Sequence, residues 1–288
     1  MISFANRDGF IWFNGSYKKW TDSNIHILNH GLHYASCVFE GIRVYETKIF
    51  KLDEHIHRLF KSAAILDLKI PYSIDEIISK TVELVDKEKI TNGYIRPVVW
   101  RGSEKMAISA IKASTNIAIA AWTWPSYFSP DLIDKGIKLT VSKWKRPSPE
   151  SAPTDSKAAG LYMICSLSKH EAEKDGFDDA LMMDYRNYIA EATGANIFFV
   201  KDKKLYTPRP DCFLNGITRQ SVIKIAKDNK IQVIEDHFNL EFLRDCEEVF
   251  LTGTAVEITP VASIDNYNFR VGETTKLLIE NFKKLVIL

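Results

Sequence analysis

One acidic residue stands in a stretch of sequence that offers it no obvious partner. Glu191 belongs to the segment NYIAEATGANIFFV, which begins at Asn187 and reads as two consecutive strands. The two-residue period of a strand places Glu191 on the same face as Ile189, and the segment contains no basic residue. An unpaired buried charge costs several kcal/mol. We therefore expect Glu191 either to reach water or to bind a cation, which need not come from the polypeptide.

A second charged side chain lies in the segment YIRPVVW, which otherwise has the composition of a buried strand. The strand period puts Tyr94 and Arg96 on one face, where both could contact the same ligand. A buried guanidinium requires an anion, which is either a carboxylate of the protein or a bound acid. Spacing alone favours neither possibility.

Two further segments could bind an anion through the backbone. Gly216, Ile217 and Thr218 stand at a predicted helix start, where free N–H groups and the helix dipole attract a phosphate. The plainer interpretation is that Thr218 is an ordinary N-cap, and spacing alone favours it. The segment TGTA, residues 252–255, follows a predicted strand and could form an anion-binding nest, although an uneventful turn is the commoner outcome.

Arg58 and Lys157 are the remaining candidates for chemistry. Arg58 lies about 200° around a predicted helix from Ile56, so it is either solvated or directed into a charged pocket. Lys157 is predicted to open a helix after a polar loop, and as a single feature it reads as a solvated lysine. Motifs of serine hydrolases, zinc proteases and dinucleotide-binding folds are absent, and His55 and His57 fall on different helical faces. We therefore predict no metal site.

Composition narrows the class of protein. The 288 residues are 45% hydrophobic with a net charge of +1, so neither nucleic acid nor an anionic membrane is expected as a main partner. The basic clusters at 143–146 and 201–204 are short, and we interpret each as a solvated strand end or hairpin tip. Four scattered cysteines suit a reducing compartment, and neither a signal-peptide pattern nor an apolar run of roughly 20 residues is present. The sequence thus predicts a soluble, cytoplasmic protein.

Strands and helices alternate in the first third of the chain. Asn14-Gly15 predicts a hairpin, and apolar residues at i, i+3, i+4 and i+7 from Ile56 predict a helix. The S-x-x-E pattern at Ser73 predicts a capping box that opens a second helix, and we expect this helix to end near residues 92–93.

The second half is rich in predicted strands. Turns at 186–187 and 202–203, with a helix after Gly216, predict a mixed or antiparallel sheet that can close on itself. The proline-containing segment 124–136 marks a connection. We therefore predict an α/β (α+β) protein with a small N-terminal domain over 1–122, a connection over 123–134 and a larger C-terminal domain over 135–288.

Taken together and in order, these segments resemble the branched-chain amino acid aminotransferases, within the class IV pyridoxal-phosphate-dependent aminotransferases. The resemblance covers nearly the whole chain through HYASCVFEGIR, EHIHRL, YIRP, W-x-x-Y at 124–127, SKAAGLY, EATGANIF, NGITR and TGTAVEITP. Several motifs in one order are far more specific than any single motif. The resemblance implies the class IV fold, with a small α/β domain, a larger pseudo-barrel domain and the cofactor between them.

The resemblance implies pyridoxal 5′-phosphate as the cofactor and gives each candidate a role. Lys157 matches the catalytic lysine that binds the cofactor covalently, and Glu191 matches the acid that binds its pyridine nitrogen. Tyr162 matches the tyrosine at the phenolic oxygen. The phosphate site is matched by Arg58, Ile217, Thr218 and Thr254. The substrate pocket would be lined by Tyr34, Phe39, Tyr94, Arg96, Trp124, Tyr127, Thr254 and Ala255, with Arg96 at the distal carboxylate of glutamate.

The chain departs from the family pattern at three places. Leu161 stands where relatives often have Asn, and Ala192 where many have Gly. Both changes preserve the implied polar contacts. Trp100-Arg101 is a bulkier and more charged continuation of YIRP, and it could reshape the mouth of the pocket.

The implied activity is transamination of branched-chain L-amino acids (Leu, Ile and Val) with 2-oxoglutarate, which gives branched 2-oxo acids and L-glutamate. The family also implies a homodimer or higher homo-oligomer. Alternatives within the same fold are a D-amino acid aminotransferase and an aminodeoxychorismate lyase. The R-x-H pair expected of the first alternative is replaced by Arg96-Pro97-Val98. A non-catalytic binding protein is a further alternative, and the set Lys157, Tyr162 and Glu191 argues against it.

Overall fold

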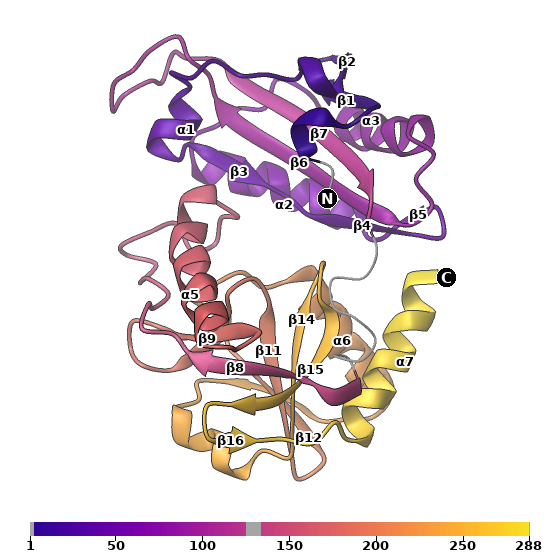
Figure 1. Cartoon of the computed structure of the whole chain (residues 1–288), viewed down its shortest axis with the longest axis vertical. Coiled ribbons are helices and arrows are strands. Elements are labelled where there is room, and N and C mark those ends of the chain that lie inside the picture. Colours follow the sequence, from indigo (N-terminus) through magenta and orange to yellow (C-terminus); the bar gives the residue numbers. More distant parts are fainter. Residues whose placement is uncertain (1–2, 125–133, 288) are drawn as a thin grey trace. The chain divides into compact units, whose positions relative to one another are not determined.

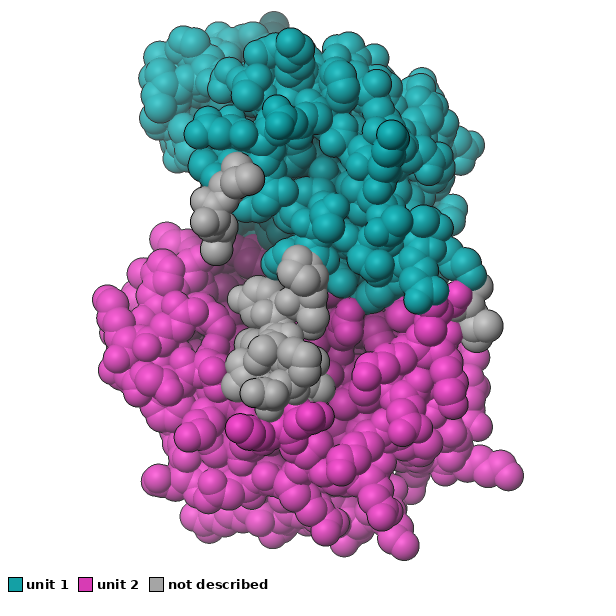
Figure 2. Space-filling view, turned by 45° about the vertical axis from the view of Figure 1, so that its right-hand side comes forward, with its two compact units in different colours: residues 1–125, 156–160 teal, residues 126–155, 161–288 magenta. Residues whose placement is uncertain are grey.

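The computed structural model describes residues 3–124 and 134–287. The chain divides into two compact units (Figure 1). Unit 1 consists of residues 1–125 and 156–160, and unit 2 of residues 126–155 and 161–288 (Figure 2). The short piece 156–160 therefore belongs to unit 1, although the chain on both sides of it belongs to unit 2. The domain boundaries drawn from the sequence remain a prediction.

Unit 1 is built on an antiparallel sheet with the strand order β2-β1-β7-β6-β4-β5, in which β3 also pairs with β6. The predicted hairpin at Asn14-Gly15 joins β1 to β2, and its turn residues have φ values of 45° and 89°. Positive φ at both positions is the geometry that favours Asn-Gly. The strands are β1 (Phe10–Phe13), β2 (Ser16–Lys19), β3 (Cys37–Phe39), β4 (Ile42–Tyr45), β5 (Lys48–Ile49), β6 (Gly93–Arg101) and β7 (Thr115–Thr123).

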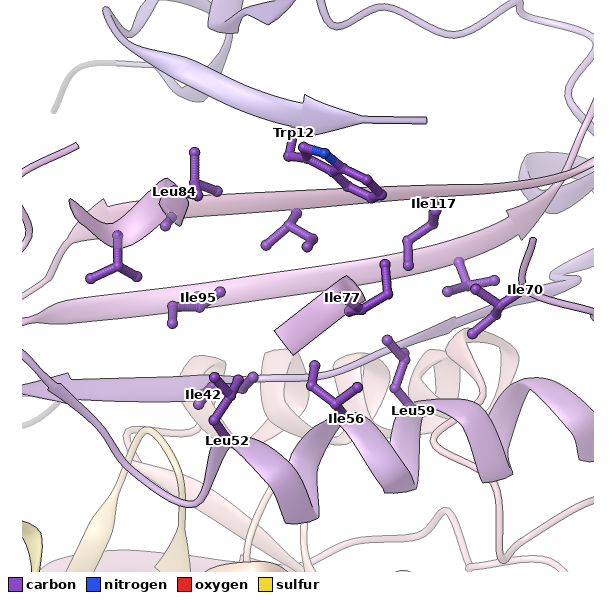
Figure 3. Close-up of a cluster of buried hydrophobic side chains, with 14 of the residues drawn as sticks. Trp12, Ile42, Leu52, Ile56, Leu59, Ile70, Ile77, Leu84, Ile95 and Ile117 are labelled. Atoms are coloured by element: carbon purple, nitrogen blue, oxygen red, sulfur yellow. The ribbon is translucent and has the colours of Figure 1, made fainter. Parts of the chain in front are cut away.

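The core of unit 1 lies between this sheet and two helices, α2 (Leu52–Ile65) and α3 (Ile74–Lys87). Figure 3 shows Ile56 and Leu59 of α2 in the same apolar cluster as Ile95 and Ile117 of the sheet. The predicted apolar stripe of α2 is thereby confirmed. A short helix, α1 (His30–Tyr34), precedes β3.

The capping box of α3 is also confirmed. Ser73 Oγ accepts from Glu76 N at 3.2 Å, and the Glu76 carboxylate accepts from Ser73 N at 2.7 Å. The helix ends at Lys87, earlier than the expected end near 92–93. The reason is local, because Lys89 adopts a left-handed φ of 51°, which terminates a helix.

Unit 2 contains a mixed sheet with the strand order β10-β9-β8-β15-β14-β11-β12-β13, and β16 pairs with β15. Strand β8 runs parallel to β9 and β15, and β12 runs parallel to β13. Ile189 N in β10 donates to Phe238 O, just beyond β13, at 2.7 Å. This bond links the two ends of the strand order, as expected of a pseudo-barrel. The strands are β8 (Ile137–Val141), β9 (Asp179–Met183), β10 (Ile189–Ala192), β11 (Asn196–Lys201), β12 (Lys204–Pro208), β13 (Val233–Asp236), β14 (Glu248–Gly253), β15 (Glu257–Ile264) and β16 (Tyr267–Asn268).

The helices α5 (Tyr162–Lys174), α6 (Ile217–Asp228) and α7 (Glu273–Ile287) accompany this sheet. The predicted turns are confirmed by left-handed φ values at Asn187, Asp202 and Lys203. The basic cluster at 201–204 is the tip of the β11–β12 hairpin, as expected. None of the helices that the structure describes is both long and apolar enough to cross a bilayer.

Candidate active site

Lys157 lies in an extended segment of unit 1 and not at the start of a helix. Its backbone N donates to Ser62 Oγ of α2 at 3.0 Å, and its carbonyl accepts from Phe39 N of β3 at 3.2 Å. Ala158 forms an antiparallel bridge with Val38. Lys157 therefore does not itself open a helix, because neighbouring elements take up its backbone groups. A 3-10 helix begins two residues later, over Ala159–Leu161, and leads directly into α5 at Tyr162.

The side chains of Lys157 and Arg96 both lie near the aromatic ring of Phe39. Its Nζ lies 5.1 Å from the centroid of the Phe39 ring, and Arg96 Cζ lies 4.7 Å from the same centroid. Both charges thus lie within cation–π distance of a single aromatic residue. Lys157 is half-buried rather than fully solvated.

Arg96 and Tyr94 face the same way, as their spacing in the strand predicts. Arg96 Nη2 donates to Tyr94 Oη at 3.2 Å, and Tyr94 packs edge-on against Trp124 at 4.7 Å between centroids. Arg96 Nε is buried and has no hydrogen-bond partner among the described residues. Phe39, Tyr94, Arg96 and Trp124 therefore form one aromatic surface that carries one guanidinium.

Another predicted pocket residue of unit 1, Tyr34, packs against a different neighbour. Tyr34 is at the end of α1, is 43% exposed, and lies against His30 with ring centroids 4.5 Å apart. Tyr127 lies outside the described residues. Arg101 donates to the carbonyls of Ala110 at 3.1 Å and Asp67 at 2.7 Å. Trp100 packs edge-on against Phe13 with ring centroids 5.4 Å apart, so both residues have a structural role.

Arg58 is bound to a carboxylate that was not among the predicted site residues. Its guanidinium donates twice to Glu40, which is fully buried, and His55 Nδ1 lies 2.7 Å from the same carboxylate. Burial alone would raise the pKa of Glu40, but Arg58 and His55 outweigh it and hold that pKa well below its usual range. Burial lowers the pKa of His55, and the hydrogen bond to Glu40 opposes this shift.

In unit 2, Glu191 forms an ion pair with a cation of the chain itself, the guanidinium of Arg146. Arg146 Nε lies 3.4 Å from Glu191 Oε1, and Asn196 Nδ2 donates to Glu191 Oε2 at 3.1 Å. Burial opposes the charge on Arg146, but the Glu191 carboxylate outweighs it and raises the pKa of the guanidinium. Arg146 is buried, so its interpretation as part of a solvated cluster is wrong. No local signal pointed to Arg146, because its partner lies far away in the sequence.

Arg146 also ties Glu191 to the start of α5. Its Nη1 donates to Leu161 O at 3.4 Å and contacts Cys165 Sγ at 3.5 Å. Leu161 directly precedes Tyr162, the first residue of α5. The carboxylate and the predicted tyrosine are therefore positioned by elements that share one buried arginine.

The predicted phosphate segment begins α6. Gly216, rather than Thr218, is the N-cap, and no side-chain cap is found at this end within the described part of the chain. The plainer interpretation of Thr218 is therefore wrong: Thr218 is inside the first turn and buried. The first amides of a helix have no acceptor within the helix, so this end attracts an anion.

The TGTA segment connects β14 to β15. Thr254 and Ala255 form a half-buried turn between these strands. Thr252, at the end of β14, has a buried Oγ1 with no hydrogen-bond partner among the described residues. An orphaned hydroxyl beside a turn is a feature that a bound polar group would satisfy.

One further group of possible metal ligands occurs in unit 2. Asp184, Asp211 and Cys212 bring ligand atoms within 4.8 Å of one another. Arg186 Nη2, however, lies 2.7 Å from Asp184 and 2.9 Å from Asp211. The acidic charge is therefore compensated by the chain, and we assign this cluster a structural role.

The chain is similar to known proteins over almost its whole length. The family model described as amino-transferase class IV matches residues 37–264. A probable branched-chain-amino-acid aminotransferase of Rickettsia felis is 46% identical over 284 residues, which is 99% of this chain and 97% of the relative. The branched-chain-amino-acid aminotransferase of Pseudomonas aeruginosa is 38% identical over 275 residues, with 94% and 90% covered.

Solved structures give the same result. The crystal structure of the Escherichia coli branched-chain amino acid aminotransferase has a TM-score of 0.94 and 37% identity, covering 97% of this chain and 95% of that chain. The branched-chain amino acid aminotransferase of Thermobaculum terrenum, solved in its PLP-form, has a TM-score of 0.88 and 29% identity, covering 97% and 94%.

Proposed function

Because the chain belongs to the class IV aminotransferases, we propose that it transfers the amino group of branched-chain L-amino acids to 2-oxoglutarate. The donors are leucine, isoleucine and valine, and the products are branched 2-oxo acids and L-glutamate. The observation that carries this proposal is the aromatic surface around Arg96, built from Phe39, Tyr94 and Trp124. It offers an apolar wall for an aliphatic side chain and one cation for a second carboxylate.

The proposed cofactor is pyridoxal 5′-phosphate, and the residues present fit it. A pyridinium suits Glu191, whose carboxylate is held by Arg146 and Asn196, and a phosphate suits the amides that open α6. When bound, this cofactor supplies an electron-accepting ring that stabilises negative charge at the substrate Cα. The residues proposed to hold it are Arg58, Lys157, Tyr162, Glu191, Ile217, Thr218 and Thr254.

The chain's own groups then have defined tasks. Glu191 accepts the ring N–H and keeps that nitrogen protonated. Lys157 Nζ takes the proton from the substrate Cα as general base. Arg96 binds the distal carboxylate of glutamate or 2-oxoglutarate, and the backbone of the TGTA segment binds the α-carboxylate. The proposed pocket comprises Tyr34, Phe39, Tyr94, Arg96, Trp124, Tyr127, Thr254 and Ala255.

We further propose a cytoplasmic homodimer. All four cysteines are free thiols, which suits a reducing compartment.

Unit 1 exposes large apolar side chains in and beside α1, with Ile27 70%, Leu32 60% and Ile108 84% exposed. Patches of this kind mark interfaces, and we assign this one to a second copy of the chain. Light scattering of the purified protein tests the assignment, with Ile108→Asp expected to yield monomers; a monomeric wild-type chain would refute it.

An amino-donor panel tests the activity. We expect turnover of L-leucine, L-isoleucine and L-valine that requires 2-oxoglutarate, and no turnover by Lys157→Ala. Turnover of D-alanine without L-leucine would instead identify a D-amino acid aminotransferase. Pyruvate release from aminodeoxychorismate without an acceptor would identify a lyase. A bound chromophore that borohydride does not fix onto Lys157 would indicate a binding protein.

A further inference from the structure

Asn196 is a buried polar residue that the proposed function uses only as a partner of Glu191. It is the first residue of β11 and is 5% exposed. Its Nδ2 donates to Glu191 Oε2 at 3.1 Å and to Leu214 O at 3.0 Å, and its Oδ1 accepts from Gly216 N at 3.2 Å. One short side chain thus bonds the Glu191 carboxylate at one end and the N-cap of α6 at the other.

The three partners fix the orientation of this amide. Glu191 and Leu214 each present an oxygen, so both require the NH₂ group, whereas Gly216 presents an N–H and requires the carbonyl oxygen. A flipped amide would place its oxygen against the oxygens of Glu191 and Leu214 and its NH₂ group against the N–H of Gly216. All three hydrogen bonds would then be lost. The side chain is therefore a rigid link rather than an adaptable contact.

The lack of a side chain at Gly216 leaves room for the hydrogen bond from its N–H to Asn196 Oδ1. A Cβ added at position 216 would lie 2.3 Å from Asn196 Oδ1, far inside van der Waals contact. The φ of Gly216 is −59°, an ordinary value for any residue, so the need for glycine here is steric and not conformational. The absence of a side chain at 216 allows the Asn196 amide to approach the start of α6.

We propose that Asn196 is a positioning residue that sets the separation between the Glu191 carboxylate and the first amides of α6. This inference rests on the proposed function, in which Glu191 binds the ring nitrogen and α6 binds the phosphate of one cofactor molecule. Because both groups are bonded to the same amide, a displacement at one end is passed to the other. The cofactor ring and its phosphate are thereby held in matched positions.

A double-mutant cycle tests this coupling. Gly216→Ala removes no polar group but displaces the Asn196 amide, whereas Asn196→Ala removes the link. The measured quantities are the dissociation constant of pyridoxal 5′-phosphate and the pH midpoint of the visible absorbance of the bound cofactor. We expect Asn196→Ala to weaken binding by about tenfold or more and to shift the midpoint. Gly216→Ala should shift the midpoint in the wild-type background and shift it no further when Asn196 is already Ala.

The outcomes separate this inference from the proposed function. If the wild-type chain binds the cofactor but the midpoint shifts of the two substitutions are additive, only this inference is overturned, and the proposed function stands. Failure of the wild-type chain to bind pyridoxal 5′-phosphate overturns both. Asn281→Ala is the matched control, since Asn281 lies on α7 and donates to Leu277 O of the same helix, and it should change neither quantity. Where Asn196→Ala does not fold, Asn196→Ser takes its place with the same expectation, since its shorter side chain cannot span both ends.

Discussion

Arg58 binds Glu40 through two parallel hydrogen bonds, from Nε to Oε1 at 2.6 Å and from Nη2 to Oε2 at 2.9 Å. The Glu40 side chain is completely buried, and the Arg58 side chain is 16% exposed. The pair fixes the plane of the guanidinium, as bidentate arginine–carboxylate contacts do. Arg58 is therefore held in place before any ligand arrives.

Glu40→Gln should destabilise unit 1 strongly. The substitution keeps the shape of the side chain but leaves the Arg58 charge without its buried counter-ion, at a cost of about 3–5 kcal/mol in the free energy of unfolding. Chemical denaturation followed by fluorescence measures this cost. Glu54→Gln is the control, because Glu54 is exposed on α2 and pairs at 3.0 Å with Lys51, the N-cap residue of that helix. We expect the control to cost less than about 1 kcal/mol. Equal effects of both variants would contradict the prediction.

The same carboxylate predicts a pH dependence of stability. The pKa of Glu40 is lower in the folded than in the unfolded chain, so the unfolded chain takes up the proton first as the pH falls. The stabilisation is complete above about pH 5 and is lost as the pH falls through the unfolded value of about 4.3 towards the folded value. The difference in denaturation midpoint between wild type and Glu40→Gln should therefore shrink below about pH 5. A constant difference down to about pH 3 would show that folding does not change the pKa of Glu40.

Arg146→Met should destabilise unit 2 of the cofactor-free protein. It removes the guanidinium beside the Glu191 carboxylate, and breaking a buried pair of this kind costs about 3–5 kcal/mol. The double variant Arg146→Met with Glu191→Gln should recover part of this loss, since the charge left behind is also removed. Chemical denaturation of the wild type, Arg146→Met, Glu191→Gln and the double variant gives the coupling energy. A double variant no more stable than Arg146→Met would argue against the pair.

Lys143→Met provides the matched control for Arg146. Lys143 belongs to the same basic cluster, but its side chain is 65% exposed and pairs with Glu171 at 2.8 Å. We expect a change of less than about 1 kcal/mol. The contrast between two basic residues of one cluster isolates the effect of burial.

Arg96→Met should weaken the use of a dicarboxylic acceptor much more than that of a monocarboxylic acceptor. The variant keeps the length of the side chain and removes the cation proposed to bind the distal carboxylate. We expect the Michaelis constant for the dicarboxylic acceptor, 2-oxoglutarate, to rise by about 10- to 100-fold, and that for a branched 2-oxo acid to change by less than about threefold. Steady-state kinetics with both acceptors measures this. An equal rise for both acceptors would mean that Arg96 supports the pocket rather than recognising the second carboxylate.

The features that can be predicted correctly from sequence depend on residues close together in the chain. The capping box joins Ser73 to Glu76, and the hairpin turn is the dipeptide Asn14-Gly15, so a short window contains all the relevant chemistry. Tyr94 and Arg96 share a face because of the strand period alone.

The features that local patterns miss depend on contacts between distant segments. Arg146 follows the basic residues Lys143 and Lys145, which are exposed, and the local pattern therefore indicates a solvated residue. Only the packing of β10 brings Glu191 close to Arg146. Lys157 follows a polar loop, as helix starts often do, but its backbone is bonded by Ser62. Tertiary contacts of this kind have no signature in a local pattern.

Residues 156–160 pack with unit 1 while their neighbours on both sides pack with unit 2, so no single cut in the gene can separate the units cleanly. A fragment truncated near residue 125 would lack Ala158, which forms a bridge with Val38, and would contain no Lys157. Synthesis must likewise extend past residue 160 before the first unit can assemble in full. Split reporters or circular permutants of this chain would need to carry that pentapeptide with the N-terminal half.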